Sequence, residues 1–200
     1  MKLYGTVTSP YVRRVRVLAD IVGAEYQLVD VSTEEGQLQL RTVTPIWKIP
    51  VLDTGEKALF DSAVINAYLL KRYGNRLVRT QSGVGRWREQ NLITCIDGAT
   101  DAAINVFYLA RDGVTADASA YLAKQQARVE SAMNWIEKQL DGPWFTETER
   151  LGRAEIALLT TLEWMEFRGT YEPARHPSLL RFMEAHRGAE VFVRTHPDAG

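Results

Sequence analysis

The chain has 200 residues, of which 46% are hydrophobic and 24% charged, the balance of a soluble globular protein. This length allows one large domain or two small ones that bury a core without disulfide or metal staples. The formal net charge of -1 argues against a nucleic-acid partner and against a polybasic membrane anchor. The single cysteine, Cys95, excludes an intrachain disulfide, a dithiol redox pair and a cysteine-based zinc cluster, and it fits a cytoplasmic protein.

The amino-terminal segment has no secretory pattern, because Arg13, Arg14 and Arg16 interrupt it before a long apolar stretch can form. No uncharged apolar run approaches the roughly 20 residues that a transmembrane helix needs. We therefore expect a mature, soluble chain with no membrane partner. We interpret the three arginines as the solvated side of the first helix.

The first 75 residues alternate between strand and helix patterns. Glycine is enriched just past helix ends and in tight turns, which places several boundaries. In chain order the patterns predict a strand at 3–7, a helix at 11–22 ending at Gly23, a strand at 26–31, a short irregular helix within 32–41, a hairpin of strands at 49–52 and 58–60, and a helix at 64–73 ending at Gly74. This order indicates a small mixed sheet covered by helices.

The polar stretch 74–85 is predicted to link two domains, 1–77 and 84–200. Beyond it the sequence predicts helices at 86–111, 117–140, 153–168 and 178–187. In the third of these, apolar residues lie on nearly every face, which is typical of a buried central helix. The second domain is therefore predicted to be all-helical.

The segment Thr8-Ser9-Pro10-Tyr11 lies where the first strand passes into the first helix. Ser9 before Pro10 fits an N-cap followed by proline at the first helical position, which on its own explains both residues. A hydroxyl at a helix N-terminus can also donate a hydrogen bond to an anion such as a thiolate. Both roles remain open at this point.

Two further segments can likewise be interpreted either as local structure or as part of a ligand site. Pro50 is a plain edge-strand proline, or it follows a cis bond that turns the Ile49 backbone outward to pair with an extended peptide. Asp61 and Ser62 are helix caps, or they hold the ammonium and carboxylate groups of a ligand.

Taken together, in this order and at these separations, the three segments resemble the glutathione S-transferase superfamily over essentially the whole chain, in a serine-type, bacterial-like cytosolic class. The resemblance implies a thioredoxin-like α/β first domain of order βαβαββα and an all-α second domain. It also implies glutathione as co-substrate, a small electrophilic second substrate, a detoxifying role and a homodimer, with no metal.

The resemblance implies a role for individual residues. Ser9 is at the catalytic hydroxyl position, and Asp61 and Ser62 match the pair that holds the γ-glutamyl end. Lys48 falls where the family contacts the glycine carboxylate, and Ile49-Pro50 is similar to the valine and cis-proline pair. Tyr4 and Thr8 are rival hydroxyls.

Compared with the related glutaredoxins, whose first helix opens with Cys-Pro-Tyr-Cys, this chain has Ser9 and Val12 in place of both sulfurs. Disulfide chemistry at this position is therefore excluded, and the reactive thiol has to come from the ligand. Two residues depart from the family pattern: Trp47, which can close or reshape the loop over the glycyl end, and Gly152, which replaces the Ser or Thr cap of the buried helix.

Other candidates have simpler explanations. His176, His186 and His196 match no zinc spacing and are predicted to be surface or capping residues. Cys95 lies among apolar residues, which favours a packed thiol over one that faces substrate. The aromatic residues predicted for a second-substrate pocket, although helical spacing also suits a core, are Tyr11, Tyr108 and Trp164.

The sequence thus predicts a cytoplasmic glutathione transferase in which Ser9 stabilises the thiolate that attacks an apolar electrophile. Two alternatives use the same scaffold: a glutathione-dependent isomerase, and a non-catalytic binding or regulatory protein. Retention of Ser9, Pro50 and Ser62 favours an enzyme, since a pure interaction scaffold has no physical need of all three.

Overall fold

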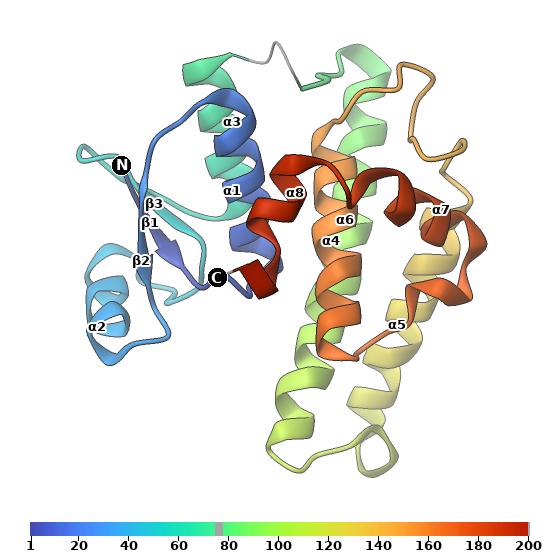
Figure 1. Ribbon diagram of the computed structural model, residues 1–200. Coiled ribbons are helices and arrows are strands. Elements are labelled where there is room, and N and C mark those ends of the chain that lie inside the picture. Colours follow the sequence, from blue (N-terminus) through green and yellow to red (C-terminus); the bar gives the residue numbers. More distant parts are fainter. Residues whose placement is uncertain (75–77, 200) are drawn as a thin grey trace. The chain divides into compact units, whose positions relative to one another are not determined.

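A computed structural model describes residues 1–74 and 78–199, which form two compact units (Figure 1). The first unit comprises Met1–Arg79 and the tail from Gly188 onward, and the second comprises Thr80–Arg187. Residues 75–77 of the predicted linker lie outside the described residues. The tail was assigned to the helical domain on sequence pattern, whereas in the structure it packs with the first unit.

A four-stranded sheet of order β2-β1-β3-β4 forms the centre of the first unit. Strand β1 (Lys2–Gly5) runs parallel to β2 (Gln27–Asp30) and antiparallel to β3 (Val51–Asp53), which pairs antiparallel with β4 (Ala58–Leu59). The helices are α1 (Pro10–Val22), α2 (Glu34–Val43) and α3 (Ser62–Tyr73). This arrangement confirms the predicted βαβαββα domain.

The two faces of the sheet carry different helices. Figure 1 shows α1 and α3 on one side and α2 on the other. On the α2 side, Tyr4, Val31, Leu40 and Val51 form one buried cluster. Because adjacent strand residues point to opposite faces, Leu3 turns away from this cluster and is fully buried on the other side.

Helix α2 is a regular α-helix of ten residues, where the polar sequence indicated only a short irregular one. Its first turn is capped by Thr33, whose hydroxyl accepts a hydrogen bond from Gly36 N at 3.0 Å. Gly36 also lies directly against the Asp30 carbonyl, where a side chain would collide. The cap and this close approach hold the helix on the end of β2.

Helix α1 is joined to the carboxyl-terminal helix α8 (Glu190–Thr195) by its arginines. The Arg13 guanidinium donates to the Phe192 carbonyl at 3.0 Å and to Thr195 Oγ1 at 3.4 Å. Arg13 and Arg14 are only 1% and 3% exposed, so the interpretation of these residues as a solvated face was wrong. For Arg13 the reason is that the Phe192 carbonyl and the Thr195 hydroxyl of α8 accept hydrogen bonds from its guanidinium, and a helix C-terminus attracts cations.

The second unit is helical, as predicted. Its helices are α4 (Gly83–Arg111), α5 (Ala120–Glu137), α6 (Arg153–Arg168) and α7 (Pro177–His186), and short 3-10 turns lie at Ala116–Ala118 and Pro173–Arg175, with a third in the first unit's tail at Pro197–Ala199. Of the 16 residues in α6, 12 are buried, which confirms the predicted central helix.

The start of α6 is stabilised by a buried carboxylate rather than by its cap residue, Gly152. Glu155 Oε2 accepts a hydrogen bond from Gly152 N at 2.9 Å, and Glu155 Oε1 accepts one from Phe145 N at 3.3 Å. One glutamate therefore satisfies backbone donors from two segments, and glycine is tolerated as the N-cap.

Two of the three histidines are buried, not at the surface. His186 Nε2 lies 2.7 Å from the Pro143 carbonyl, and its ring packs edge-on to Trp144. His176 is the residue before α7, but its side chain makes no cap hydrogen bond and bonds instead to Tyr171 and Glu137. Both are held by residues distant in sequence.

Helix α4 is the one helix among the described residues that is long and apolar enough to cross a membrane by length and composition alone. Core helices of water-soluble proteins meet the same criterion, and α4 packs against α5 and α6 within its unit.

Candidate functional site

The register of the sheet brings the three predicted segments to one end of it. Tyr4 pairs with Val51, so the loop that leaves β1 toward Ser9 lies beside Pro50 at the start of β3. Leu52 pairs with Leu59, so the chain leaving β4 toward Asp61 reaches the same end. The candidate site is therefore an edge where a loop, a strand start and two helix starts converge.

Ser9 is the N-cap of α1 and is half-buried. Its Oγ accepts a hydrogen bond from Val12 N at 3.3 Å, and its carbonyl accepts one from Arg13 N at 2.9 Å. Because Oγ acts as the acceptor in this contact, its own O–H proton is available for another acceptor. The capping role is therefore present, and it is compatible with donation to an anion.

The rival hydroxyls are placed less favourably. Tyr4 is buried in the apolar cluster on the α2 side of the sheet. Its burial, and then the negative charge of Asp53, raise the pKa of its phenol. Thr8 is half-buried, and its hydroxyl lies 3.5 Å from that of Thr6. Neither Tyr4 nor Thr8 caps a helix in the structure.

The Ile49-Pro50 peptide bond is cis, and so is the bond between Phe60 and Asp61. Pro50 is buried and immediately precedes β3, while Ile49 is half-buried and packs against the cluster around Tyr4. Lys48 is exposed, so its ammonium is accessible to a ligand carboxylate.

Trp47 adopts a backbone conformation that favours glycine, with φ of 51°. Its side chain is 59% exposed, and the Arg41 guanidinium lies 4.7 Å from the centre of its ring. The loop thus keeps a glycine-like backbone with a large side chain, which is stacked on α2 through Arg41.

Asp61 and Ser62 open helix α3. Asp61 Oδ1 accepts a hydrogen bond from Ala63 N at 2.9 Å, which is an N-cap contact, and the side chain is exposed. Ser62 is the first helical residue and is buried. The first N–H groups of a helix have no partner within it, so this end of α3 suits a carboxylate.

The predicted second-substrate residues do not fall in one unit. Tyr11 lies on α1 with the Arg14 guanidinium 4.7 Å from its ring centre, whereas Tyr108 and Trp164 belong to the second unit. Those two are linked through Phe107, whose ring contacts Tyr108 at 5.2 Å and Trp164 at 6.0 Å between centroids. Phe107 was not predicted as part of this group, although it directly precedes Tyr108.

Gly5 was also missed, although it directly supports the site. A Cβ on Gly5 would lie 2.5 Å from a methyl group of Val12, so only glycine lets β1 pass this close to the first turn of α1. A glycine between a strand and a helix cap was the available signal.

Metal and thiol chemistry have little support in the described part of the chain. Residues 1–74 and 78–199 contain no group of three or more His, Cys, Asp or Glu side chains that could hold a metal ion. Cys95 is half-buried, and its burial raises the pKa of its thiol, which disfavours the thiolate.

Two family models match the chain. Residues 3–77 match the model described as glutathione S-transferase, N-terminal domain, and residues 112–185 match that described as glutathione S-transferase, C-terminal domain.

Three of the similar proteins match this chain over most of their length. The uncharacterized GST-like protein YibF of Escherichia coli is 26% identical over 98% of both chains. Glutathione S-transferase D7 of Anopheles gambiae is 28% identical over 82% of this chain and 76% of its own. A crystal structure of a glutathione S-transferase from Methylobacillus flagellatus with glutathione bound has a TM-score of 0.84 and 28% identity, and 98% of each chain is covered.

Proposed function

The chain belongs to the glutathione S-transferase superfamily, and from this premise we propose that it is a cytoplasmic enzyme that transfers glutathione to small apolar electrophiles. The observation that carries the proposal is the convergence of Ser9, Ile49-Pro50 and Asp61-Ser62 at one end of the sheet. Each segment alone has a local explanation, helix capping for Ser9 and Asp61 and an edge-strand proline for Pro50, but their convergence provides polar groups for both ends of a short peptide. A detoxifying role follows from this reaction.

Glutathione is proposed to lie extended along this end of the sheet. The Ile49 backbone pairs with the peptide, as an edge strand pairs with an added one. The Ser62 N–H and hydroxyl hold the γ-glutamyl carboxylate, and the Asp61 carboxylate attracts the ammonium group. Lys48 is placed to attract the glycine carboxylate at the other end.

Ser9 is proposed to activate the ligand's thiol as a hydrogen-bond donor. A free thiol titrates near ~8.5, and lowering that pKa by about two units requires roughly 2.7 kcal/mol of preference for the thiolate. One hydrogen bond to a charged acceptor contributes ~1.5 to 3 kcal/mol, and a helix N-terminus adds ~0.3 to 1 kcal/mol. Ser9 with the first turn of α1 is therefore sufficient, and no general base is needed.

The thiolate then attacks an electrophilic carbon of the second substrate. Tyr108, which is 57% exposed, and the half-buried Phe107 are proposed to contribute an aromatic surface for this substrate, whereas Trp164, predicted for the same pocket, is only 4% exposed and packs against Phe107 as a core residue. Tyr11, from the first unit, stays a prediction for the same role.

A homodimer is proposed as the working form. Large apolar side chains are exposed on the first turns of α4, where Val84 is 85% and Trp87 is 66% exposed. Such side chains are usually covered when they gather at an interface. Light scattering after size exclusion should give twice the chain mass, and Trp87→Glu should give the monomer.

The deciding experiment follows the ultraviolet absorbance of the thiolate while glutathione is bound and the pH is varied. Ser9→Ala should raise the pKa of the bound thiol by one to two units, about 1.4 to 2.8 kcal/mol. Ser119→Ala is the matched control, because Ser119 is also an N-cap, with Oγ 3.4 Å from Leu122 N at the start of α5. Both variants should lose about 1 kcal/mol of stability through the cap, but only the first should change the thiol.

Three outcomes would change the proposal. An unchanged thiol pKa in Ser9→Ala would move the donor role to Tyr4 or Thr8. Absence of glutathione binding would leave a non-catalytic binding protein. A thiolate that forms, with a substrate that is rearranged but not conjugated, would indicate glutathione-dependent isomerisation.

A further inference from the structure

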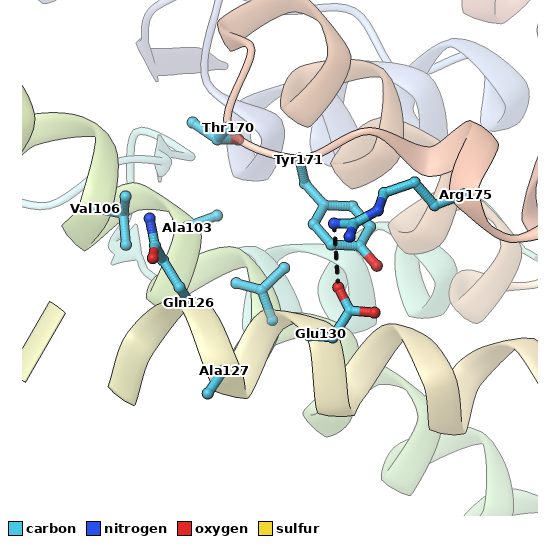
Figure 2. A pocket seen from close by; sticks show the side chains of 9 residues that line it. Ala103, Val106, Gln126, Ala127, Glu130, Thr170, Tyr171 and Arg175 are labelled. Atoms are coloured by element: carbon cyan, nitrogen blue, oxygen red, sulfur yellow. Dashed lines mark hydrogen bonds and ion pairs between the residues drawn. The ribbon is translucent and has the colours of Figure 1, made fainter. Parts of the chain in front are cut away.

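A cavity of about 400 Å³ lies in the second unit, between α4, α5 and the segment that follows α6 (Figure 2). It lies within the second unit and shares no residue with the proposed glutathione site. Its volume is within the range of about 300 to 1,000 Å³ that is usual for small-molecule sites.

The floor of the cavity is apolar and made of small side chains. Ala103 and Val106 come from α4, and Ala127 and Val129 come from α5. Short side chains facing each other across two helices leave room that longer ones would fill. This floor suits the apolar body of a ligand.

One wall carries a carboxylate with weakly held partners. The Glu130 side chain is 43% exposed, and its hydrogen bonds with Arg175 and Asn134 are both 3.4 Å long. Figure 2 shows the Arg175 guanidinium over the Tyr171 ring, with a dashed line that marks its contact with the Glu130 carboxylate. Ionic hydrogen bonds are normally about 2.7 to 2.9 Å long, so Glu130 has capacity for a closer donor.

The orientation of Tyr171 is set by a chain of hydrogen bonds behind it. Its hydroxyl lies 2.5 Å from His176 Nε2, and His176 Nδ1 lies 2.9 Å from Glu137 Oε2. Burial alone would raise the pKa of Glu137, but hydrogen bonds from His176 and from Ser178 N lower it, so Glu137 is ionised near neutral pH. His176 thus bridges Glu137 and the Tyr171 hydroxyl, and Tyr171 also interacts with the Glu130 side chain; a phenol oxygen can accept a hydrogen bond as well as donate one.

The Tyr171 oxygen therefore keeps a lone pair for a ligand donor. Burial, and then the nearby charge of Glu130, raise the pKa of this phenol, which keeps it neutral. Glu137 lies behind the cavity and is engaged by His176 and Ser178 N, so the acceptors that line the cavity itself include the Glu130 carboxylate and the Tyr171 oxygen. A ligand that donates hydrogen bonds to both acceptors and takes the place of the Arg175 guanidinium at Glu130 is a cation.

We propose that this cavity binds a small amphipathic organic amine, with its ammonium group between Glu130 and the Tyr171 oxygen and its apolar body on the floor of Ala103, Val106, Ala127 and Val129. Arg175 then competes with the ligand for Glu130. This competition predicts that two substitutions change the affinity for the amine in opposite directions: removing Arg175 strengthens binding, while removing Glu130 weakens it.

The test uses three probes of similar shape at pH 7, without glutathione: 2-phenylethylammonium, 2-phenylethanol and 3-phenylpropanoate. Titration calorimetry should show the ammonium binding about tenfold more tightly than the alcohol and the carboxylate binding weakest. Glu130→Gln should remove the preference for the ammonium, Tyr171→Phe should weaken its binding, and Arg175→Gln should strengthen it. Glu172→Gln, an exposed neighbour outside the cavity, is the matched control and should change nothing.

Equal affinity for the three probes, preference for the carboxylate, or an unchanged preference in Glu130→Gln would each overturn the proposal. Circular dichroism of every variant separates loss of binding from loss of fold. Ser9→Ala should bind the ammonium as the unmodified protein does, so failure here and failure at the glutathione site are distinguishable.

Discussion

The polar side chains of two regions, the candidate site in the first unit and the buried interior of the second, serve different purposes. In the first, Ser9 and Asp61 bond to backbone N–H groups three and two residues further on and are at least partly exposed. In the second, Glu155, Thr161 and His176 are buried and bond to partners 10, 61 and 39 residues away.

This difference indicates which polar side chains can still contact a ligand. A helix cap that faces solvent can satisfy its own helix and still contact a ligand, because one hydroxyl or carboxylate has several hydrogen-bonding positions. A buried pair of polar groups uses those positions to hold elements together, and losing one partner leaves the other unsatisfied. In the second unit both arrangements occur together at the cavity beside Tyr171, where the partly exposed Glu130 lies near the hydrogen-bonded pair of His176 and Glu137.

The largest expected effect contrasts two carboxylates. Glu155→Ala removes the acceptor of two backbone N–H groups at a fully buried position and should lower the free energy of unfolding by about 3 kcal/mol or more. Asp61→Ala removes an exposed cap and should cost about 1 kcal/mol. Urea unfolding followed by circular dichroism measures both, and equal losses would contradict the comparison.

A second contrast uses the same change, glycine to alanine, in each unit. Gly5→Ala should destabilise the protein by about 1 to 3 kcal/mol, because its Cβ meets the stiff Val12 side chain at 2.5 Å. Gly98→Ala, inside α4 with no atom within 4 Å of its Cβ, should instead stabilise by about 0.5 to 1 kcal/mol.

Thermal unfolding measures whether each variant is more or less stable than the unmodified protein. Adding Val12→Ala to Gly5→Ala should recover part of the loss, since it removes the methyl groups that collide. A double variant less stable than both single ones would show that the Gly5 contact is not the cause.

The pH dependence of the free energy of unfolding should depend in part on Glu137, a carboxylate of the second unit. Glu137 has a folded-state pKa below its ordinary value of 4.5, so its contribution is present above pH 4.5 and is lost as the pH falls through the lower folded-state value. Glu137→Gln should cost on the order of 1 kcal/mol at pH 6 and little at pH 3. Urea unfolding across this range measures it, with the exposed Glu147→Gln as the variant expected to follow the unmodified curve.

The smallest effect is expected at Trp47. Trp47→Gly relieves a left-handed backbone conformation, which favours the variant by roughly 1 to 2 kcal/mol. It also loses the contact with Arg41, about 0.5 to 1 kcal/mol, and adds the entropy cost of glycine, about 0.5 to 1 kcal/mol. The melting temperature should therefore hardly change, and a large loss would show that the ring supports the loop. Glutathione titration of this variant measures what the ring does to affinity.

Much of the first unit could be predicted because its signals are local. Ser9-Pro10 at the start and Gly23 at the end delimit α1 within a few residues, and Gly55 marks the hairpin between β3 and β4. Helix α2 was predicted less well, since its regularity depends on Gly36 packing against Asp30 and on Leu40 entering the cluster around Tyr4.

The errors share one cause, which is a partner far away in the chain. Arg13 is buried because the carbonyl of Phe192 receives its guanidinium, and no periodicity within α1 reveals that. His176 was predicted to be a surface or capping residue, and its burial depends on Glu137 in α5 and on Tyr171 after α6. Charged residues at helical spacing favour a solvated face unless a distant acceptor compensates them.

The sequence alone was enough to predict the order of strands and helices and the helical nature of the second unit, since caps, turns and periodicity act over a few residues. It also identified positions 9, 50, 61 and 62 as candidates for the site. The meeting of two helix caps and the Ile49-Pro50 segment at one end of the sheet depends on the tertiary structure, because strand register joins residues about 50 positions apart, as it does Tyr4 and Val51. The tertiary structure also decided which polar groups are buried in pairs and which stay open to a ligand. That distinction depends on burial, which one segment of sequence does not specify.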